Sequence, residues 1–252
     1  MIKSETRGRV ARIRFDRPDK KNAITREMYT QLAVALTAAD ADGEVRAILL
    51  HGTVDCFTSG NDINDFLKGP FGGEGSPTWQ LFQALPRVAK PIVAAVGGPA
   101  VGIGTTMLLH CDLVYAAANA RFQMPFVPIG IVPEFGSTFI LPLVAGHQRA
   151  AEVLMLGQPF TAQKAYELGI VTAVVPQEDL FKEAEKAAAT LAGLPRESLR
   201  FTKRMMRATH EKIISERIMQ EGREVLERLR SPEAKEAMSA FLEKRKPDFS
   251  RF

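Results

Sequence analysis

The sequence is poor in the residues that mark several classes of protein. Its 252 residues include two cysteines and four histidines. Cys56 and Cys111 follow no metal-binding or redox spacing, and the histidines are scattered. This pattern excludes a disulfide scaffold and gives no support to a metal site, so we expect no metal cofactor. Two isolated thiols favour a reducing compartment.

Long apolar runs are also missing. No stretch approaches the roughly 18 residues that a membrane span needs. The first residues, MIKSETRGRVARIRF (1–15), carry charges without the apolar region of a secretory peptide. We therefore expect a cytoplasmic protein with no membrane partner.

The charge is only mildly unbalanced, with 33 Lys and Arg against 29 Asp and Glu and a net charge of +4. Such a surplus suits a polyanionic small ligand, a weak nucleic-acid patch or a solvated surface with a few extra lysines. The basic segment RFTKRMMRATHEK (200–212) lacks the interleaved aromatic residues of stacking modules. We therefore expect no nucleic-acid partner.

What is present is an alternation of strand and helix patterns in the first half. Apolar and β-branched runs predict strands at 10–15, 45–52, 91–98 and 111–117. Helical spacing predicts helices at 24–42, with Thr25 as N-cap, at 79–89 and at about 103–110. Because the connections are too long for hairpins, this alternation predicts βαβ units and a largely parallel sheet.

The second half has a helical pattern. Helices are predicted at 146–156, 161–168, 178–192, 196–208, 211–229 and 233–244. The sequence thus predicts an α/β core followed by an all-helical C-terminal region that serves self-association.

Two glycine-rich turns follow predicted strands. AAVGGPAVGIGTTMLL (94–109) lacks the lysine of a phosphate-binding loop, and Met107 stands where the dinucleotide fingerprint needs its third glycine. Such a turn either packs a helix closely on a strand or offers unpaired N–H groups to an anion or a developing oxyanion. In CFTSGNDIND (56–65), Asp62 is a candidate cap for the next helical turn.

The segment GIVPEFGST (130–138) places one carboxylate, Glu134, among glycine, proline and apolar residues. Two interpretations are open: an exposed turn, or a carboxylate buried at a cost.

Together these segments resemble the enoyl-CoA hydratase/isomerase family, which has the crotonase (ClpP-like) fold. The resemblance runs from VARIRFDRPDKKNAIT (10–25) to FLEKRKPDF (241–249) and rests on the order and spacing of its motifs. It implies an α/β fold with a repeated ββα spiral core over residues 1–195. A helical C-terminal oligomerisation region, over 196–252, would build homotrimers or hexamers. The implied substrates are acyl-CoA thioesters, with coenzyme A as part of the substrate and no separate cofactor.

The resemblance also assigns site residues. The oxyanion hole would consist of the backbone N–H groups of Asn61 and Ile103. The residues implied in substrate and CoA binding are Asn22, Ala23, Ile24, Ser59, Gly60, Asp62, Gly102, Gly104 and Lys244. The residues implied in the acyl pocket are Asp65, Trp79, Phe82, Met107, Phe126 and Phe135. The glycine-rich stretch 68–78 is either a mobile flap over this pocket or a solvent loop.

The reaction that the resemblance implies depends on which catalytic carboxylates of the family this sequence retains. Family hydratases use two carboxylates, and the matching positions here hold Thr106 and Phe126. Monofunctional Δ3,Δ2-enoyl-CoA isomerases carry one glutamate in a turn that matches PEFGST (133–138), with Phe135 where glycine is more usual. We therefore expect Glu134 to move a proton from C2 to C4 of a 3-enoyl-CoA, and its apolar surroundings to raise its pKa.

Other interpretations remain at this stage. The chain could be a hydratase with weak or displaced acids or another acyl-CoA enzyme of this family. A further alternative is a non-enzymatic role in RNA binding, since some relatives bind RNA. His110, Cys111 and Asp112 are expected to serve packing and capping. The charges of 200–212 are expected on a solvated helix face or at the CoA entrance.

Overall fold

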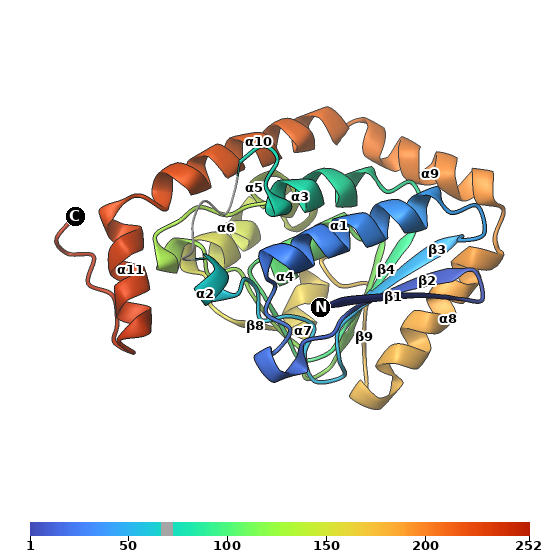
Figure 1. The fold of residues 1–252 in the computed structure, drawn as a ribbon, viewed down its shortest axis with the longest axis horizontal. Helices are drawn as coiled ribbons and strands as arrows, with labels where there is room; N and C mark the ends of the chain where they lie inside the picture. Colours follow the sequence, from blue (N-terminus) through green and yellow to red (C-terminus); the bar gives the residue numbers. More distant parts are fainter. Residues whose placement is uncertain (67–72) are drawn as a thin grey trace.

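The computed structural model describes residues 1–66 and 73–252. It has the predicted α/β architecture, with two sheets and a helical C-terminal region (Figure 1). The larger sheet has the order β1-β2-β3-β4-β6-β9. Its strands are β1 (Ile2–Arg7), β2 (Val10–Phe15), β3 (Ala47–His51), β4 (Ile92–Val96), β6 (Leu113–Ala117) and β9 (Ala173–Val175). β1 pairs antiparallel with β2, and the other pairs are parallel.

The parallel strands are buried on both faces, which explains their continuous apolar runs. In β3, Ile48 and Leu50 belong to the core cluster beneath α1 (Arg26–Ala41) and α3 (Pro77–Arg87). Leu49 belongs to the cluster on the opposite face, beneath α8 (Leu180–Gly193). The predicted N-cap of α1 is confirmed, because the Thr25 hydroxyl accepts a hydrogen bond from Met28 N at 3.3 Å.

A smaller sheet carries the glycine turns. It consists of β5 (Pro99–Val101), β7 (Arg121–Gln123) and β8 (Phe160–Thr161), in that order. Strands of two or three residues are too short to show a hydrophobic period, so the sequence analysis missed these three strands and β9. It also missed β1, whose six residues are mostly polar and exposed.

The remaining helices surround these sheets. They are α2 (Ile63–Phe66), α4 (Ile103–Thr106), α5 (Ser137–Ala145), α6 (His147–Leu156), α7 (Ala162–Glu167), α9 (Arg196–Ala208), α10 (Glu211–Arg228) and α11 (Pro232–Leu242). The 3-10 turns are η1 (Pro18–Lys20), η2 (Met107–His110), η3 (Val127–Ile129) and η4 (Gln177–Asp179). The single helix predicted at about 103–110 is thus α4 followed by η2, and α5 was not predicted.

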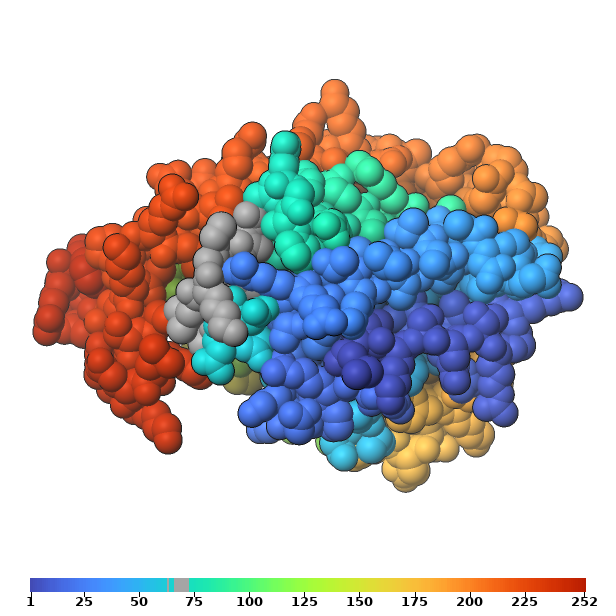
Figure 2. All heavy atoms as spheres, in the orientation of Figure 1, coloured from blue at the N-terminus to red at the C-terminus, as the bar shows by residue number. Residues whose placement is uncertain are grey.

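The C-terminal helices lie along the core. α10 contacts α5, and α11 contacts η3. In the space-filling view, this region, coloured orange to red, runs along the upper edge and forms the left end of the molecule (Figure 2). The predicted flap at 68–78 lies partly outside the described residues, which resume at Gly73, and Ser76 then caps α3. α3 therefore starts two residues before the predicted 79–89.

Candidate active site

The two glycine turns lie in direct contact. Isolated parallel bridges join Ile24 to Asn61 and Thr58 to Ala100. Gly60 has φ +90°, and a Cβ placed on it would lie 2.8 Å from the carbonyl oxygen of Val101. Only glycine therefore fits at position 60, and the sequence brings residues 58–61 against residues 100–104.

Two backbone amides at this contact are free. Within the described residues, neither Asn61 N nor Ile103 N donates a hydrogen bond to a protein acceptor. Ile103 opens α4, where the first N–H groups of a helix have no partner within the helix. Both amides can therefore donate to an oxygen atom of a ligand.

The side chain of Asn61 has a fixed place. Its Oδ1 accepts a hydrogen bond from the Tyr29 hydroxyl at 2.6 Å, and Tyr29 is fully buried on α1. Burial raises the pKa of Tyr29 well above its usual value, and the charge of Glu134 raises it further. Tyr29 therefore bonds to the side chain of Asn61 and lies close enough to Glu134 for the charge of that carboxylate to affect its pKa.

Glu134 is buried, with 7% of its surface exposed. Its Oε1 lies within the protein and finds no hydrogen-bond partner in the described part of the chain. Burial, and secondarily the negative charge of Glu221, raise the pKa of Glu134 to about 8. The exposed-turn interpretation is therefore wrong, and the pKa shift has the direction expected from the composition.

Phe135 takes a conformation that favours glycine. It has φ +61° and is fully buried. Its ring stacks on Phe82 at a centroid distance of 4.2 Å and lies 4.1 Å from the His110 ring. His110 Nε2 is 2.8 Å from the carbonyl oxygen of Phe135, so the nitrogen must carry the proton and donate. Burial lowers the pKa of His110 to about 4, which keeps the ring neutral.

The sequence analysis expected His110 to serve packing but did not identify its contacts with Phe135. Asp112 accepts hydrogen bonds from Ile92 N at 2.7 Å and Lys203 Nζ at 2.6 Å, and Arg207 lies 3.3 Å away. Arg207 also donates to the carbonyl oxygen of His110 at 2.7 Å. The packing role expected for Asp112 is confirmed.

A second acid lies near Glu134. Glu221 is buried on α10 and accepts hydrogen bonds from Gly136 N, Thr138 N and the Thr138 hydroxyl. These donors lie on the turn after Glu134. The sequence offered no signal for this contact, because about 85 residues separate the partners.

The two positions that hold carboxylates in the family's hydratases hold uncharged residues here, Thr106 and Phe126. Thr106 and Phe126 are both buried, and the Thr106 hydroxyl lies 3.5 Å from the carbonyl oxygen of Ile103. Phe82 and Met107 are also buried, and the half-buried Trp79 packs on the same core. Their acyl-pocket assignment stays a prediction.

Several residues assigned to substrate binding have structural partners, and their assignment stays a prediction. The Asn22 side chain is fully buried, donates to the carbonyl oxygens of Cys56 and Phe57, and accepts from Arg17 N. Its backbone is engaged as well, because Asn22 N donates to Arg17 O at 2.9 Å and Asn22 O accepts from the Thr58 hydroxyl at 2.7 Å.

The two aspartates of this segment are also engaged. Asp62 caps α2 by accepting from Asp65 N at 3.1 Å, as expected, and pairs with Arg17 at 2.6 Å. Asp65 accepts from Arg26 N at 2.6 Å and so holds the start of α1.

The backbone of the remaining binding residues forms part of the turns. Ile24 N donates to Gly60 O, Ser59 N donates to Lys21 O, and the carbonyl oxygen of Ala23 accepts from Arg17. Gly102, with φ +56°, precedes α4, and a Cβ on Gly104 would lie 2.6 Å from Thr58 Cγ2. Lys244 is exposed after α11.

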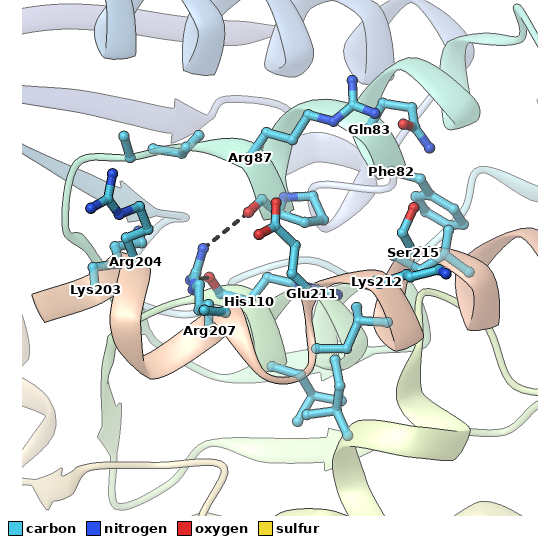
Figure 3. A pocket seen from close by; sticks show the side chains of 18 of the residues that line it. Phe82, Gln83, Arg87, His110, Lys203, Arg204, Arg207, Glu211, Lys212 and Ser215 are labelled. Atoms are coloured by element: carbon cyan, nitrogen blue, oxygen red, sulfur yellow. Dashed lines mark hydrogen bonds between the residues drawn. The ribbon is translucent and has the colours of Figure 1, made fainter. Parts of the chain in front are cut away.

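A separate cavity of about 880 Å³ lies between α3, α9 and α10 (Figure 3). Phe82 and His110 form part of its wall, while Glu134 does not line it. Lys203 and Arg207 of the basic segment turn toward it and bond to main-chain carbonyl oxygens of Lys90, Pro86 and His110. The expectation of a solvated helix face is wrong for these two cations, since they tie α9 to the core.

Comparisons with known proteins decide the family. The model of the family "Enoyl-CoA hydratase/isomerase" matches residues 5–251. The chain belongs to the enoyl-CoA hydratase/isomerase family. It is 34% identical over 248 residues to 1,2-epoxyphenylacetyl-CoA isomerase of Escherichia coli (strain K12), which covers 96% of this chain and 95% of that protein.

Two further relatives extend the comparison. Enoyl-CoA delta isomerase 2 of Rattus norvegicus is 37% identical over 206 residues, which are 79% of this chain and 52% of that protein. The structure of Pseudomonas aeruginosa OdaA superimposes with a TM-score of 0.93 and 47% identity, over 96% of this chain and 98% of that one.

The predicted crotonase fold is thereby confirmed, and the chain is an acyl-CoA enzyme of this family. Its relatives include isomerases and probable hydratases, so family membership alone leaves the reaction open. In the part of the chain that the structure describes, no helix is long and apolar enough to span a bilayer. Over the same residues, no three His, Cys, Asp or Glu side chains group as metal ligands.

Proposed function

We propose that the protein converts 3-enoyl-CoA into 2-enoyl-CoA, with Glu134 as the single proton shuttle. The carboxylate removes a proton from C2, the dienolate oxygen accepts hydrogen bonds from Asn61 N and Ile103 N, and the carboxylic acid returns the proton to C4. The double bond moves from C3–C4 to C2–C3, and no water is consumed.

The observation that carries the proposal is the state of Glu134. A buried carboxylate with an unpartnered oxygen is unfavourable for stability and suits proton transfer. A pKa of about 8 makes Glu134 a stronger base than an exposed glutamate and lies close to neutral pH, where general bases are most effective. The two free amides supply the donors that an enolate oxygen needs.

Hydration is disfavoured because it needs a second acid on the water. Thr106 cannot exchange a proton as a carboxylate does, and Phe126 has no polar atom in its side chain. The nearby Glu221 is already occupied by three donors from the turn at 136–138.

The experiment offers 3-enoyl-CoA and 2-enoyl-CoA separately to the wild type, Glu134→Gln and Glu152→Gln. Glu152 is exposed on α6 and serves as the matched control. We expect isomerisation without comparable hydration, and a loss of about 10²–10⁴ in kcat for Glu134→Gln alone. Hydration at a rate similar to isomerisation, or an active Glu134→Gln enzyme, would refute the proposal.

A further inference from the structure

Glu221 caps the N-terminus of α5, which has no capping side chain of its own. The N-cap position of α5 is Gly136, which has no side chain to accept from the first N–H groups. Glu221 supplies both of its oxygens instead: Oε2 accepts from Gly136 N, and Oε1 accepts from Thr138 N at 2.9 Å and from the Thr138 hydroxyl at 2.5 Å. A negative charge there also complements the positive end of the helix dipole.

The same contacts fix the segment that carries Glu134. The carbonyl oxygen of Glu134 accepts from Ser137 N at 3.2 Å, so that residues 134–137 form one tight turn. His110 holds the carbonyl oxygen of Phe135 from one side, and Glu221 holds Gly136 N from the other. Between these two contacts, Phe135 keeps φ +61°, a conformation that costs a non-glycine residue about 1 kcal/mol or more.

Glu134 and Glu221 are an unequal pair of buried carboxyl groups. Burial raises the pKa of Glu221 above its ordinary value, while the three hydrogen bonds that it accepts and the positive charge of Arg217 act in the opposite direction and favour its ionised form. Glu134 has an oxygen without a partner and feels the charge of Glu221. The first proton to leave the pair therefore comes from Glu221, and Glu134 retains its proton to higher pH.

The other titratable groups around the pair do not change charge near neutral pH. Tyr29, on α1, stays protonated because burial raises its pKa. His110, on η2, stays neutral because burial lowers its pKa. Arg217, on α10, contributes a positive charge near Glu221.

We propose that Glu221 is a positioning residue of the active site, which anchors the turn bearing Glu134 and, through its negative charge, makes Glu134 a stronger base. The inference rests on the proposed role of Glu134. It assigns to the C-terminal region a direct influence on proton transfer within the same chain.

The test compares Glu221→Gln with Glu224→Gln, an exposed acid one turn further along α10. The rate is measured as kcat/KM for 3-enoyl-CoA against pH. We expect Glu221→Gln to move the acid limb to lower pH by about 1 unit, the direction produced by removing a like charge, and Glu224→Gln to leave it in place. If kcat/KM fell while the acid limb of its pH profile stayed at the same pH, Glu221 would act only as a structural cap, and the proposal would be overturned.

A second measurement separates this inference from the reaction itself. The side-chain carboxyl of Glu134 is titrated by NMR in protein with ¹³C-labelled glutamate, and Glu134→Gln identifies its signal. We expect the same downward shift of the Glu134 midpoint in Glu221→Gln whether or not 3-enoyl-CoA is the substrate. An unchanged midpoint overturns the inference, whereas a shifted midpoint without isomerase activity overturns only the proposed function.

If Glu221→Gln does not fold, Thr138→Val replaces it. This change removes the hydroxyl donor to Glu221 and retains the backbone donor. Without this donor the ionised form of Glu221 is less stable, so Glu221 carries its negative charge over less of the pH range in which Glu134 titrates. We therefore expect the Glu134 midpoint to move to lower pH, as in Glu221→Gln, by a smaller amount. No movement in this variant would contradict the proposed influence of the Glu221 charge.

Discussion

At position 135 the backbone conformation favours glycine, whereas the packing of the side chain favours phenylalanine. Its φ of +61° suits glycine, yet its ring is fully buried between Phe82 and His110. Relief of the backbone strain is worth about 1–2 kcal/mol. Loss of a buried phenyl ring costs about 3–5 kcal/mol, so packing is the larger effect.

We therefore predict that Phe135→Gly lowers the free energy of unfolding by about 1–4 kcal/mol, the difference between these two effects. Phe135→Ala loses the same ring but keeps a Cβ at positive φ, and it should be less stable than Phe135→Gly by about 1 kcal/mol. Urea denaturation of both variants measures the order. If alanine were the more stable of the two, the strain argument would be wrong.

Glu134 should make the stability of the protein fall as the pH rises. Its pKa in the folded protein is about 8, above its ordinary value of 4.5. Between these values the folded chain holds a proton that the unfolded chain has released, so raising the pH favours unfolding.

Glu134→Gln removes this titration. We predict that the variant exceeds the wild type in stability by about 3 kcal/mol more at pH 8 than at pH 5. Denaturation curves at the two pH values, with Glu152→Gln as the reference, give the difference. A gap of equal size at both pH values would show that Glu134 titrates normally.

The sequence identified Glu134 and the glycine turns but not their supports. Its glycine, proline and apolar neighbours left an exposed turn and a buried carboxylate both open, and the family resemblance then implied that Glu134 is the base. The contacts of His110 and Glu221 with the same turn left no signal, because they join residues 25 and about 85 positions apart. The internal role of the Asn22 side chain likewise depends on Cys56 and Phe57, from a distant segment.

At the scale of elements, length and period decided what could be predicted. The strands of the larger sheet that are buried on both faces were found from continuous apolar runs, and α1 was found from its spacing and cap. The strands of the smaller sheet have two or three residues, and α5 contains Pro142, which argues against a helix. These elements form only because the surrounding core holds them.

The contact between the glycine turns yields an element-scale prediction. A Cβ at position 60 would lie 2.8 Å from Val101 O and would push the two turns apart. We predict that Gly60→Ala lowers kcat by about 10²–10³, the effect of losing one oxyanion donor. Gly43→Ala, at a position with no heavy atom within 4 Å, is the control. Full activity of Gly60→Ala would exclude Asn61 N as a donor in the reaction.

The attachment of α9 yields another prediction. Lys203 is nearly buried against Asp112, and burial lowers its pKa to about 8. Asp112→Ala would leave Lys203 and Arg207 without their carboxylate, and we expect a loss of about 3–5 kcal/mol. Lys203→Met should cost much less, because it removes a buried charge while Asp112 keeps Arg207 and Ile92 N. Equal losses in the two variants, measured by denaturation, would contradict this account.

At the scale of the whole molecule, the predicted homotrimer or hexamer remains a prediction. Large apolar side chains of α5 and α6 are exposed, among them Leu143, Val144, Met155 and Leu156. We expect sedimentation to give a mass of about three or six times the 27.7 kDa of one chain. Leu156→Glu should reduce that mass to one chain, whereas Lys182→Glu, on the exposed side of α8, should not. A single-chain mass for the wild type would overturn the expectation.

The distance along the chain between the turn at residues 134–138 and Glu221 has a consequence for biosynthesis. Residues 134–138 leave the ribosome long before Glu221 does, and closing a loop of about 85 residues is entropically unfavourable until α10 can dock. The nascent chain can thus contain all the strands of both sheets before Glu221 is available to the turn. A chain stalled before residue 221 would lack the hydrogen bonds from Gly136 and Thr138 to Glu221.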